Sequence, residues 1–289
     1  MVDRDSVETK VFGALRWVVI AGLALATLFP FYYMLLLSVR PIEELLRNPG
    51  RLWVSFSEWT ARTYEEVLRP TDDGGQGMLA LLGNSAFVSV GAVVLTLLVA
   101  IPGAYAVTRL RFFGSRHVHF LFLAVYLFPA ILLAVPLFVL FTKLGLRGSL
   151  VGLMIVYIAQ TVPVSIYMLR NYLATVPEGI EEAAAIDGCS RLQTLWRVTV
   201  PLAAPAIAAN ALYVFMIAWN EFLFALLFLV EDRSQWTVSL GLAQLADGVE
   251  VPKTVLMAGS VVLTIPIVIL FYAAERLLTE GLTSGADKG

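Results

Sequence analysis

The sequence predicts an all-α integral membrane protein with six transmembrane helices. Of the 289 residues, 59% are hydrophobic and only 15% are charged, whereas soluble domains carry about 25% charged residues. The mean hydropathy of +0.81 is too high for a soluble fold of this length to bury its apolar side chains. Six stretches also reach the roughly 20 mostly apolar residues that a membrane-crossing helix needs.

The six predicted spans follow one another along most of the chain. They are Trp17–Ser38, Leu79–Val107, Val118–Phe141, Leu150–Leu169, Leu202–Leu229 and Val255–Ala274. Several contain proline, namely Pro30, Pro102, Pro129, Pro136, Pro163 and Pro266. Membrane helices tolerate proline where neighbouring helices satisfy the freed carbonyl groups. We therefore expect bends within a helical bundle and no loss of spans.

Other features exclude several classes of function. The net charge is −2 and no basic stripe indicates nucleic-acid binding. The single cysteine, Cys189, excludes an intrachain disulfide, and with His117 and His119 it provides too few ligands for a usual structural zinc site. No GxxxxGK[ST] phosphate loop is present, so the chain is not expected to hydrolyse ATP itself. The N-terminal MVDRDSVETK is too acidic to begin a signal peptide, which predicts that the first span is retained.

The arginines and lysines favour a cytoplasmic N-terminus. With that orientation, inside segments hold eleven of these residues and outside segments nine, a small bias in the usual direction. The connection from Arg109 to His117 contains three arginines and no acid. Residues 1–16, 170–201 and 276–289 are then cytoplasmic. Segments 39–78, 142–149 and 230–254 are periplasmic, around a transmembrane domain of residues 17–275.

The cytoplasmic segment 170–201 is predicted to contain two short helices. Pro177 suits the first turn of a helix, where its missing N–H costs nothing, and Gly188 is a typical C-terminal stop. Ser190 and Gln193 have the spacing of a capping box, which predicts a second helix beginning there. Pro201 marks the start of the fifth span.

The first of these helices would present a narrow stripe of small side chains. Ile180, Ala183, Ala184 and Asp187 recur at helical spacing. Such a face can pack on the chain's own bundle, or it can let another protein approach closely. Periodicity alone gives these two interpretations similar weight.

The same residues resemble the EAA loop of ABC-importer permeases. The matching positions are Glu182, Ala183, Ala184, Gly188, Val198, Val200 and Pro201, with nine residues between the glycine and Val198. In that family the loop is a coupling helix that docks on a cytoplasmic ATPase, which implies coupling roles for a set of residues here. They are Glu181, Glu182, Ala183, Ala184, Asp187, Gly188 and Pro201.

The resemblance extends over most of the chain and is strongest to the carbohydrate branch, in particular the smaller six-span permease of maltose-like importers. It is carried by the stretches "NSAFVSVGAVVLTLLVAIPGAYAVTRLRFFG", "PLFVLFTKLGLRGSLVGLMIVY", "LRNYLATVPEGIEEAAAIDG" and "WNEF". It implies the type I importer permease fold. Val200 and Cys189 depart from the usual leucine and alanine but keep apolar or small side chains. Asp287 departs from an apolar residue in the tail.

The tail "GLTSGADKG" also resembles that family, in which it reaches the ATPase dimer interface. This implies an ATPase contact by Thr283, Ser284 and Gly285. The alternative is a frayed, glycine-rich terminus.

Polar residues inside the predicted spans are candidates for the translocation path. Asn220 and Glu221 interrupt the apolar fifth span beside Trp219, and a charge in mid-bilayer costs at least about 2.5 kcal/mol unless it faces a cavity or a partner. Glu221 also has no evident partner in its own segment. Tyr157 and Gln160 in the fourth span are weaker candidates, as is Asn210, because lone polar groups commonly bridge helices.

The favoured function is therefore a non-catalytic permease subunit of an ATP-driven importer of a di- or oligosaccharide. The implied partners are a second permease subunit, an ATPase dimer that carries ATP and magnesium, an extracytoplasmic sugar-binding protein and the bilayer of a bacterial or archaeal cytoplasmic membrane. The chain itself would bind no cofactor. Another solute such as glycerol phosphate is the alternative, although no arginine or lysine lies deep in a span. An intramembrane enzyme lacks clustered catalytic groups, and a passive channel would not need the inserted loop.

Overall fold

Every secondary-structure element in the described part of the chain is helical. The computed structural model describes the backbone of residues 4–110, 114, 121–122, 124–125, 127–248 and 251–286, and side chains from residue 12 to residue 276 of these ranges. The prediction of an all-α protein is confirmed in this part. The shorter elements near the N-terminus are α2 (Ile42–Arg47), η1 (Phe56–Glu58), α3 (Arg62–Leu68) and η2 (Thr71–Asp73).

The chain divides into two compact units. The first comprises residues 1–77 and 245–262, and the second comprises residues 78–244 and 263–289. Two helices, α13 (Val238–Asp247) and α14 (Lys253–Ala286), contribute to both units.

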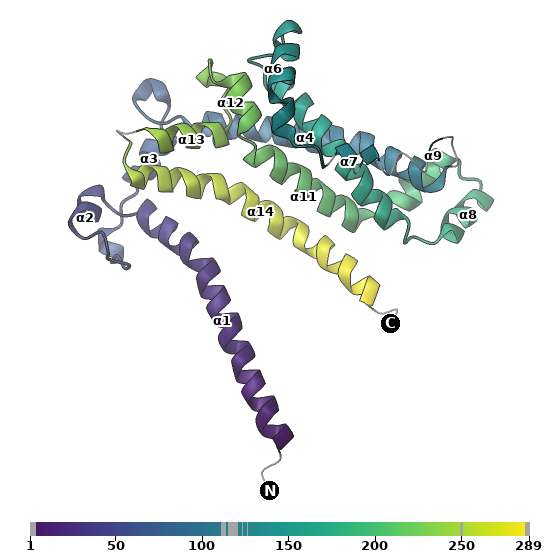
Figure 1. Ribbon diagram of the computed structural model, residues 1–289, viewed down its shortest axis with the longest axis horizontal. Helices are drawn as coiled ribbons and strands as arrows, with labels where there is room; N and C mark the ends of the chain where they lie inside the picture. Colours follow the sequence, from purple (N-terminus) through teal and green to yellow (C-terminus); the bar gives the residue numbers. More distant parts are fainter. Residues whose placement is uncertain are drawn as a thin grey trace. The chain divides into compact units, whose positions relative to one another are not determined.

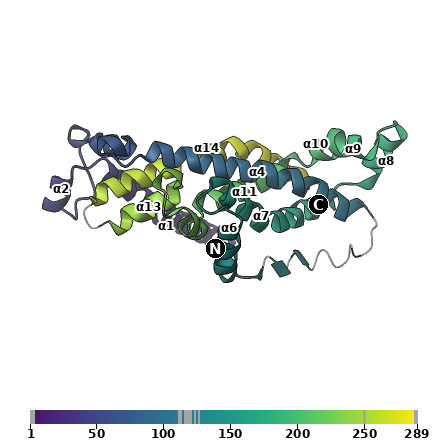
Figure 2. The same cartoon turned by 90° about the horizontal axis from the view of Figure 1, so that it is seen from above.

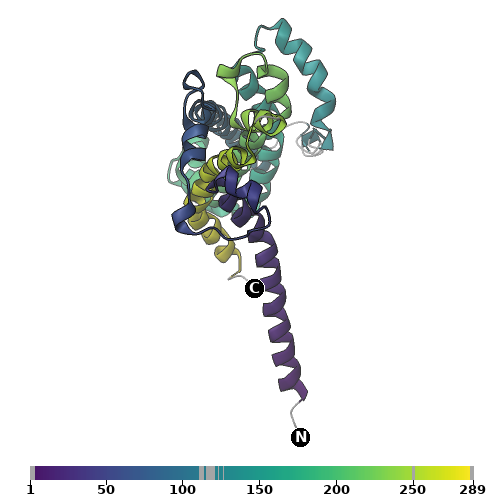
Figure 3. The same cartoon turned by 90° about the vertical axis from the view of Figure 1, so that its left-hand side faces the viewer.

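The first unit is built on the long helix α1 (Arg4–Ser38), which runs as a single rod (Figure 3). Its apolar stretch Phe12–Ser38 has the length and hydropathy of a span, and only its last three residues, Leu36, Leu37 and Ser38, are buried by the rest of the described chain. The segment that follows returns to the end of this helix, because Thr60 N donates to Val39 O at 2.9 Å. The Ser38 hydroxyl lies 2.7 Å from the Tyr64 hydroxyl.

The second unit has a core of three packed helices, α4 (Met78–Arg109), α7 (Leu150–Leu173) and α11 (Ala204–Asn220) (Figures 1 and 2). Val88, Leu153 and Val214, one from each helix, belong to the same buried cluster. A hydrogen bond of 2.9 Å between the hydroxyls of Thr96 and Thr161 crosses the α4–α7 contact. These three packed helices form the frame that positions the loop 170–201.

Four helices of the described chain are long and apolar enough to cross a membrane. They contain Phe12–Ser38, Met78–Arg109, Leu150–Leu173 and Lys253–Arg276, and they confirm the first, second, fourth and sixth predicted spans as continuous helices. The number rises to five if the pair Arg191–Leu202 and Ala204–Asn220, bent by 80°, counts as one span. As predicted, the prolines in these four helices lie inside them, at Pro30, Pro102, Pro163 and Pro266.

The other two predicted spans differ from the structure. Five of the 24 residues of Val118–Phe141 lie outside the described ones (118–120, 123 and 126), and the described part is broken into η3 (Ala130–Leu133) and α6 (Ala134–Lys143) after Pro129. The prediction of one continuous helix over Leu202–Leu229 is wrong. Helix α11 ends at Asn220, and α12 (Leu223–Leu229) begins after a break of two residues.

Candidate functional site

The two short helices predicted within residues 170–201 are present at one end of the second unit (Figure 2). Helix α8 spans Glu178–Ile186 with Pro177 at its N-cap, and α9 spans Arg191–Thr194. The chain then continues through a π-helical turn, η4 (Leu195–Thr199), and α10 (Val200–Leu202) before it reaches α11. The prediction of two helices joined at a glycine is confirmed.

The joint has the local geometry that its sequence predicts. Gly188 has φ of +87°, which favours glycine because it has no Cβ. The N–H groups of Gly188 and Cys189 donate to the carbonyls of Ala185 and Ala184, so the last turn of α8 is closed. Ser190 and Gln193 form the reciprocal capping box, with 2.8 Å from Ser190 N to Gln193 Oε1. The direction in which α9 leaves α8 is therefore set locally.

The two faces of α8 have different surroundings. Ala184 is buried against the chain itself, whereas Ala183 and Asp187 are exposed. The predicted stripe is thus divided, and Ala184 does not share the outer face with Ala183. The largest outward-facing apolar group is Ile186, which the stripe did not include and which is 87% exposed.

One arginine fastens α8 to the membrane helices. Arg109, the last residue of α4, donates from Nε to Glu181 Oε1 at 3.1 Å. The same guanidinium donates to the carbonyls of Leu173, at 3.1 Å, and Val176, at 2.8 Å, at the end of α7. Both charged side chains are nearly buried, at 9% and 10% exposure, and the Thr199 hydroxyl donates to the same carboxylate oxygen at 3.2 Å. This anchor joins α4, α7, α8 and η4.

A polar cleft of about 250 Å³ lies beside the anchor. Tyr105 and Arg109 line it from α4, Glu182 lines it from α8, and Cys189 and Arg191 line it from the joint. Glu178 adds a longer contact to Arg109, at 3.7 Å. Glu181 and Glu182, adjacent in sequence, therefore differ, because Glu181 is used internally while Glu182 remains exposed.

A second polar cluster surrounds Glu221 at the break between α11 and α12. Its carboxylate accepts from the N–H groups of Phe224, at 2.8 Å, and Ala225, at 3.2 Å. Glu221 therefore caps the N-terminus of α12. The Tyr157 hydroxyl donates to the same carboxylate at 2.7 Å. The expectation that Glu221 lies within one continuous apolar helix is therefore wrong, and its side-chain partner, Tyr157, comes from α7.

The remaining path candidates lie in different surroundings. Trp219 is buried, stacks on Phe215, and donates from Nε1 to Leu263 O at 3.2 Å. Asn220 is exposed, and its amide donates to Met216 O within its own helix. Gln160 lines a cleft of about 500 Å³ together with, among others, Tyr213 of α11. The structure thus brings Tyr157 and Glu221 together.

Sequence reasoning missed Arg109 and Thr199 as parts of the site. The charge of the arginine-rich connection predicts only on which side of the membrane it lies. Arg109 is 72 positions from its carboxylate partner, so the sequence does not indicate their contact. Thr283, Ser284 and Gly285 lie at the end of α14, where the backbone is helical but the side chains lie outside the described ones. His117 and His119 also fall outside the described residues. Within the described part, no group of three His, Cys, Asp or Glu side chains could hold a metal ion.

Comparison with known proteins agrees with this arrangement. Residues 92–284 match the family described as binding-protein-dependent transport system inner membrane component. An inner membrane ABC transporter permease protein of Escherichia coli, YcjP, is 39% identical over 93% of this chain and 95% of its own length. The trehalose/maltose permease MalG of Thermococcus litoralis is 37% identical over 92% and 94%.

A solved structure shows the same fold. A chain from a bacterial ABC transporter that imports the acidic polysaccharide alginate superposes with a TM-score of 0.78 at 25% identity, covering 96% of this chain and 98% of the other. The family match spans more than half of the chain, and it includes the loop 170–201 and the Glu221 cluster. The resemblance inferred from the EAA residues is confirmed, and the chain belongs to the family of binding-protein-dependent inner membrane components, the multi-pass, non-catalytic permease subunits of ABC transporters.

Proposed function

We propose that this chain forms one half of the translocation path of an importer for a di- or oligosaccharide. The names of its relatives support this, because one transports trehalose and maltose and a structural neighbour belongs to an alginate importer. As a binding-protein-dependent ABC component, the chain works with an ATPase and a binding protein. We assign the ATP and magnesium to the ATPase, and the other half of the path to a second permease subunit.

The observation that carries the coupling role is the anchored loop with an apolar outer face. Arg109 and Glu181 hold the inner side of α8 on the ends of α4 and α7. The outer side presents Ala183 and the almost fully exposed Ile186. A short helix fixed on one side and apolar on the other fits a groove of a partner protein. The ATPase is the partner that this chain needs, and Glu182, Asp187, Gly188 and Pro201 belong to the same coupling surface.

A charge placed on the outer face tests the docking. Ile186→Glu should prevent copurification of the ATPase and abolish ATP-dependent uptake, while the chain still inserts into the membrane. Ile186→Val keeps an apolar side chain and serves as the matched control. If Ile186→Glu retains both the ATPase and uptake, α8 is not the docking element.

The substrate path is proposed to involve Tyr157, Gln160, Trp219, Asn220 and Glu221. The cleft beside Gln160 and the paired Tyr157 and Glu221 support this assignment. Uptake by the reconstituted complex should be inhibited by disaccharides and not by glycerol phosphate. Inhibition by glycerol phosphate alone would favour the alternative solute.

Gln160→Ala should raise the KM for sugar uptake more than it lowers the maximal rate.

The topology that fits these roles has six spans with both termini in the cytoplasm. The loop 170–201 and the tail 276–289 must face the same compartment to reach one ATPase, and the tail contact is assigned to Thr283, Ser284 and Gly285. Segments 39–78, 142–149 and 230–254 then lie on the side of the membrane from which the binding protein approaches. An ATPase that still binds normally after removal of residues 281–289 would exclude the tail contact.

A further inference from the structure

The segment between α1 and α3 exposes an unusual number of large apolar side chains. Trp53 is 64% exposed, Phe56 is 74% exposed and Trp59 is 51% exposed. The rings of Phe56 and Trp59 lie 4.5 Å apart, so they form one patch. Leu46 and Leu52 are also exposed. We name residues 41–59 the return loop.

The return loop folds back along the outer surface of α1. Its far end is tied to the end of the helix through Thr60 N and Val39 O. Its middle contacts α1 further from the C-terminal end of the helix, because the Tyr32 hydroxyl donates to Leu52 O at 2.5 Å. Tyr32 precedes the last residue of α1 by six positions, or about 9 Å at 1.5 Å per residue. Leu52 therefore lies at the depth of the penultimate turns of a span.

That depth corresponds to the edge of the bilayer. The apolar stretch Phe12–Ser38 has 27 residues, which is about 40 Å of helix against a hydrocarbon thickness of about 30 Å. Its last turns, with Tyr32 and Tyr33, thus reach the level where Tyr and Trp concentrate in membrane proteins. The return loop adds two tryptophans at this level.

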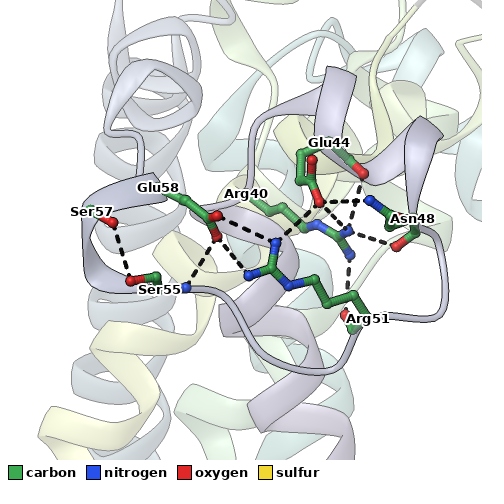
Figure 4. Close-up of polar contacts among 7 residues, drawn as sticks. All are labelled: Arg40, Glu44, Asn48, Arg51, Ser55, Ser57 and Glu58. Atoms are coloured by element: carbon green, nitrogen blue, oxygen red, sulfur yellow. Dashed lines mark hydrogen bonds and ion pairs between the residues drawn. The ribbon is translucent and has the colours of Figure 1, made fainter.

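Polar contacts centred on Arg40 and Arg51 hold the backbone of the return loop (Figure 4). Arg40 is completely buried and donates to the carbonyls of Glu44, at 3.1 Å, Asn48, at 2.6 Å, and Arg51, at 3.2 Å. Arg51 bridges two carboxylates, those of Glu44 at 3.2 Å and Glu58 at 3.0 Å. Backbone carbonyls that would otherwise need water are satisfied by a guanidinium.

The return loop thus exposes large apolar side chains together with the charged side chains of Glu43, Arg47 and Glu58. Such a mixture of aromatic and charged groups suits the boundary between lipid headgroups and acyl chains. Irregular backbone near the hydrocarbon is stable only when its polar groups are satisfied internally, and the Arg40 contacts provide that. We propose that the return loop lies in the interfacial region of the bilayer, with Leu46, Leu52, Trp53, Phe56 and Trp59 among the lipid headgroups and the upper acyl chains.

Lipid is favoured over a protein partner by two observations. The patch adjoins α1, a span of which the described chain buries only the last turn. The apolar side chains come from an irregular segment with two tryptophans, and the amphipathic indole ring suits the headgroup level. The loop would act as an outer anchor that fixes how far α1 can slide along the membrane normal.

Site-directed spin labels on the full transporter, reconstituted in lipid nanodiscs, test this proposal. In a Cys189→Ser background, single cysteines are introduced as Trp53→Cys, Phe56→Cys and Trp59→Cys. Asp72→Cys, on the exposed turn η2 of the same unit, is the aqueous control. The three loop labels should collide several-fold more with oxygen, relative to a water-soluble nickel complex, than the control label does. ATP-dependent uptake by each labelled variant verifies that the complex is assembled.

Three results would overturn the proposal. Nickel accessibility of the loop labels equal to that at position 72 would show a water-facing surface. Protection that persists unchanged when lipid is replaced by detergent of short chain length would show burial by another subunit. Protection that arises only after addition of the binding protein would show a docking surface for that protein.

A second measurement does not depend on labels at the patch itself. Replacing Trp53 and Trp59 together by serine removes the aromatic anchors without touching the Arg40 contacts. A label at Val39, at the end of α1, should then move measurably in depth, whereas the Arg40–Glu44 region keeps its protection from proteolysis. An unchanged depth at position 39 would contradict an anchoring role.

Discussion

At the scale of single residues, the nearly buried carboxylate of Glu181 depends on its hydrogen-bond donors. It is nearly buried and receives the Arg109 guanidinium and the Thr199 hydroxyl. Glu181→Gln should lower the stability of the complex by about 1–3 kcal/mol, because a buried charged donor loses its acceptor. The thermal melting of the purified complex measures this loss.

The adjacent Glu182 is a matched control for this change. It undergoes the same substitution, Glu182→Gln, on the same helix but from an exposed position. Its melting temperature should equal that of the wild type. Equal losses in both variants would show that the Arg109 contact does not stabilise the loop.

The Arg51 network predicts a pH dependence at the other unit. The amide of Asn48 and the guanidinium of Arg51 donate to Glu44 and hold the pKa of its carboxyl below its usual value. A lowered pKa in the folded state means that the contribution to stability is present above the unfolded pKa and lost as pH falls through the folded one. The melting difference between wild type and Glu44→Gln should therefore begin to shrink as pH falls below the ordinary glutamate pKa of about 4.3, and it should disappear once pH is below the lowered pKa of Glu44. A difference that is constant from neutral to acidic pH would contradict this.

At the scale of elements, alanine substitutions at two glycines of the loop should change its stability in opposite directions. Gly179 lies inside α8, and Gly188 lies just after its end. Gly188 has φ of +87°, so Gly188→Ala should destabilise the joint by about 1–2 kcal/mol, and Gly188→Asn should cost less. Gly179 lies inside α8 with open space around it, so Gly179→Ala should stabilise the helix by about 0.5–1 kcal/mol. Protease susceptibility of the loop measures both. The prediction fails if the two alanine variants shift susceptibility in the same direction.

Elements that depend on neighbours in sequence could be predicted, and those that depend on distant contacts could not. The Gly188 stop and the Ser190–Gln193 capping box need only adjacent residues, so their spacing was sufficient. The end of α11 at Asn220 could not be predicted, because an apolar sequence continues through Leu229. The break depends on Tyr157 and on the N–H groups that Glu221 caps, and the tyrosine lies 64 positions away. The Arg109–Glu181 pair was missed for the same reason.

At the scale of the whole molecule, the number of crossings decides which ends share a compartment. Three described apolar helices, α1, α4 and α7, precede the loop 170–201, and an odd number of crossings would separate this loop from the N-terminus. The predicted third span, Val118–Phe141, must therefore cross as well if both are cytoplasmic. A membrane-impermeant label should react with a cysteine at position 72 from outside, and with cysteines at positions 5 and 288 only after permeabilisation. Outside labelling at position 5 alone would mean that this segment does not cross.

The Arg109 anchor has a mechanical consequence. Its guanidinium donates hydrogen bonds to the carbonyls at the end of α7 and to the Glu181 carboxylate of α8, and Arg109 is itself the last residue of α4. A force applied at the tip of α8 would therefore reach two membrane helices at a single pivot, and neither could tilt without the other. The loop then works as a lever with a fixed fulcrum, and an ATPase pushing on α8 would turn α4 and α7 as one body.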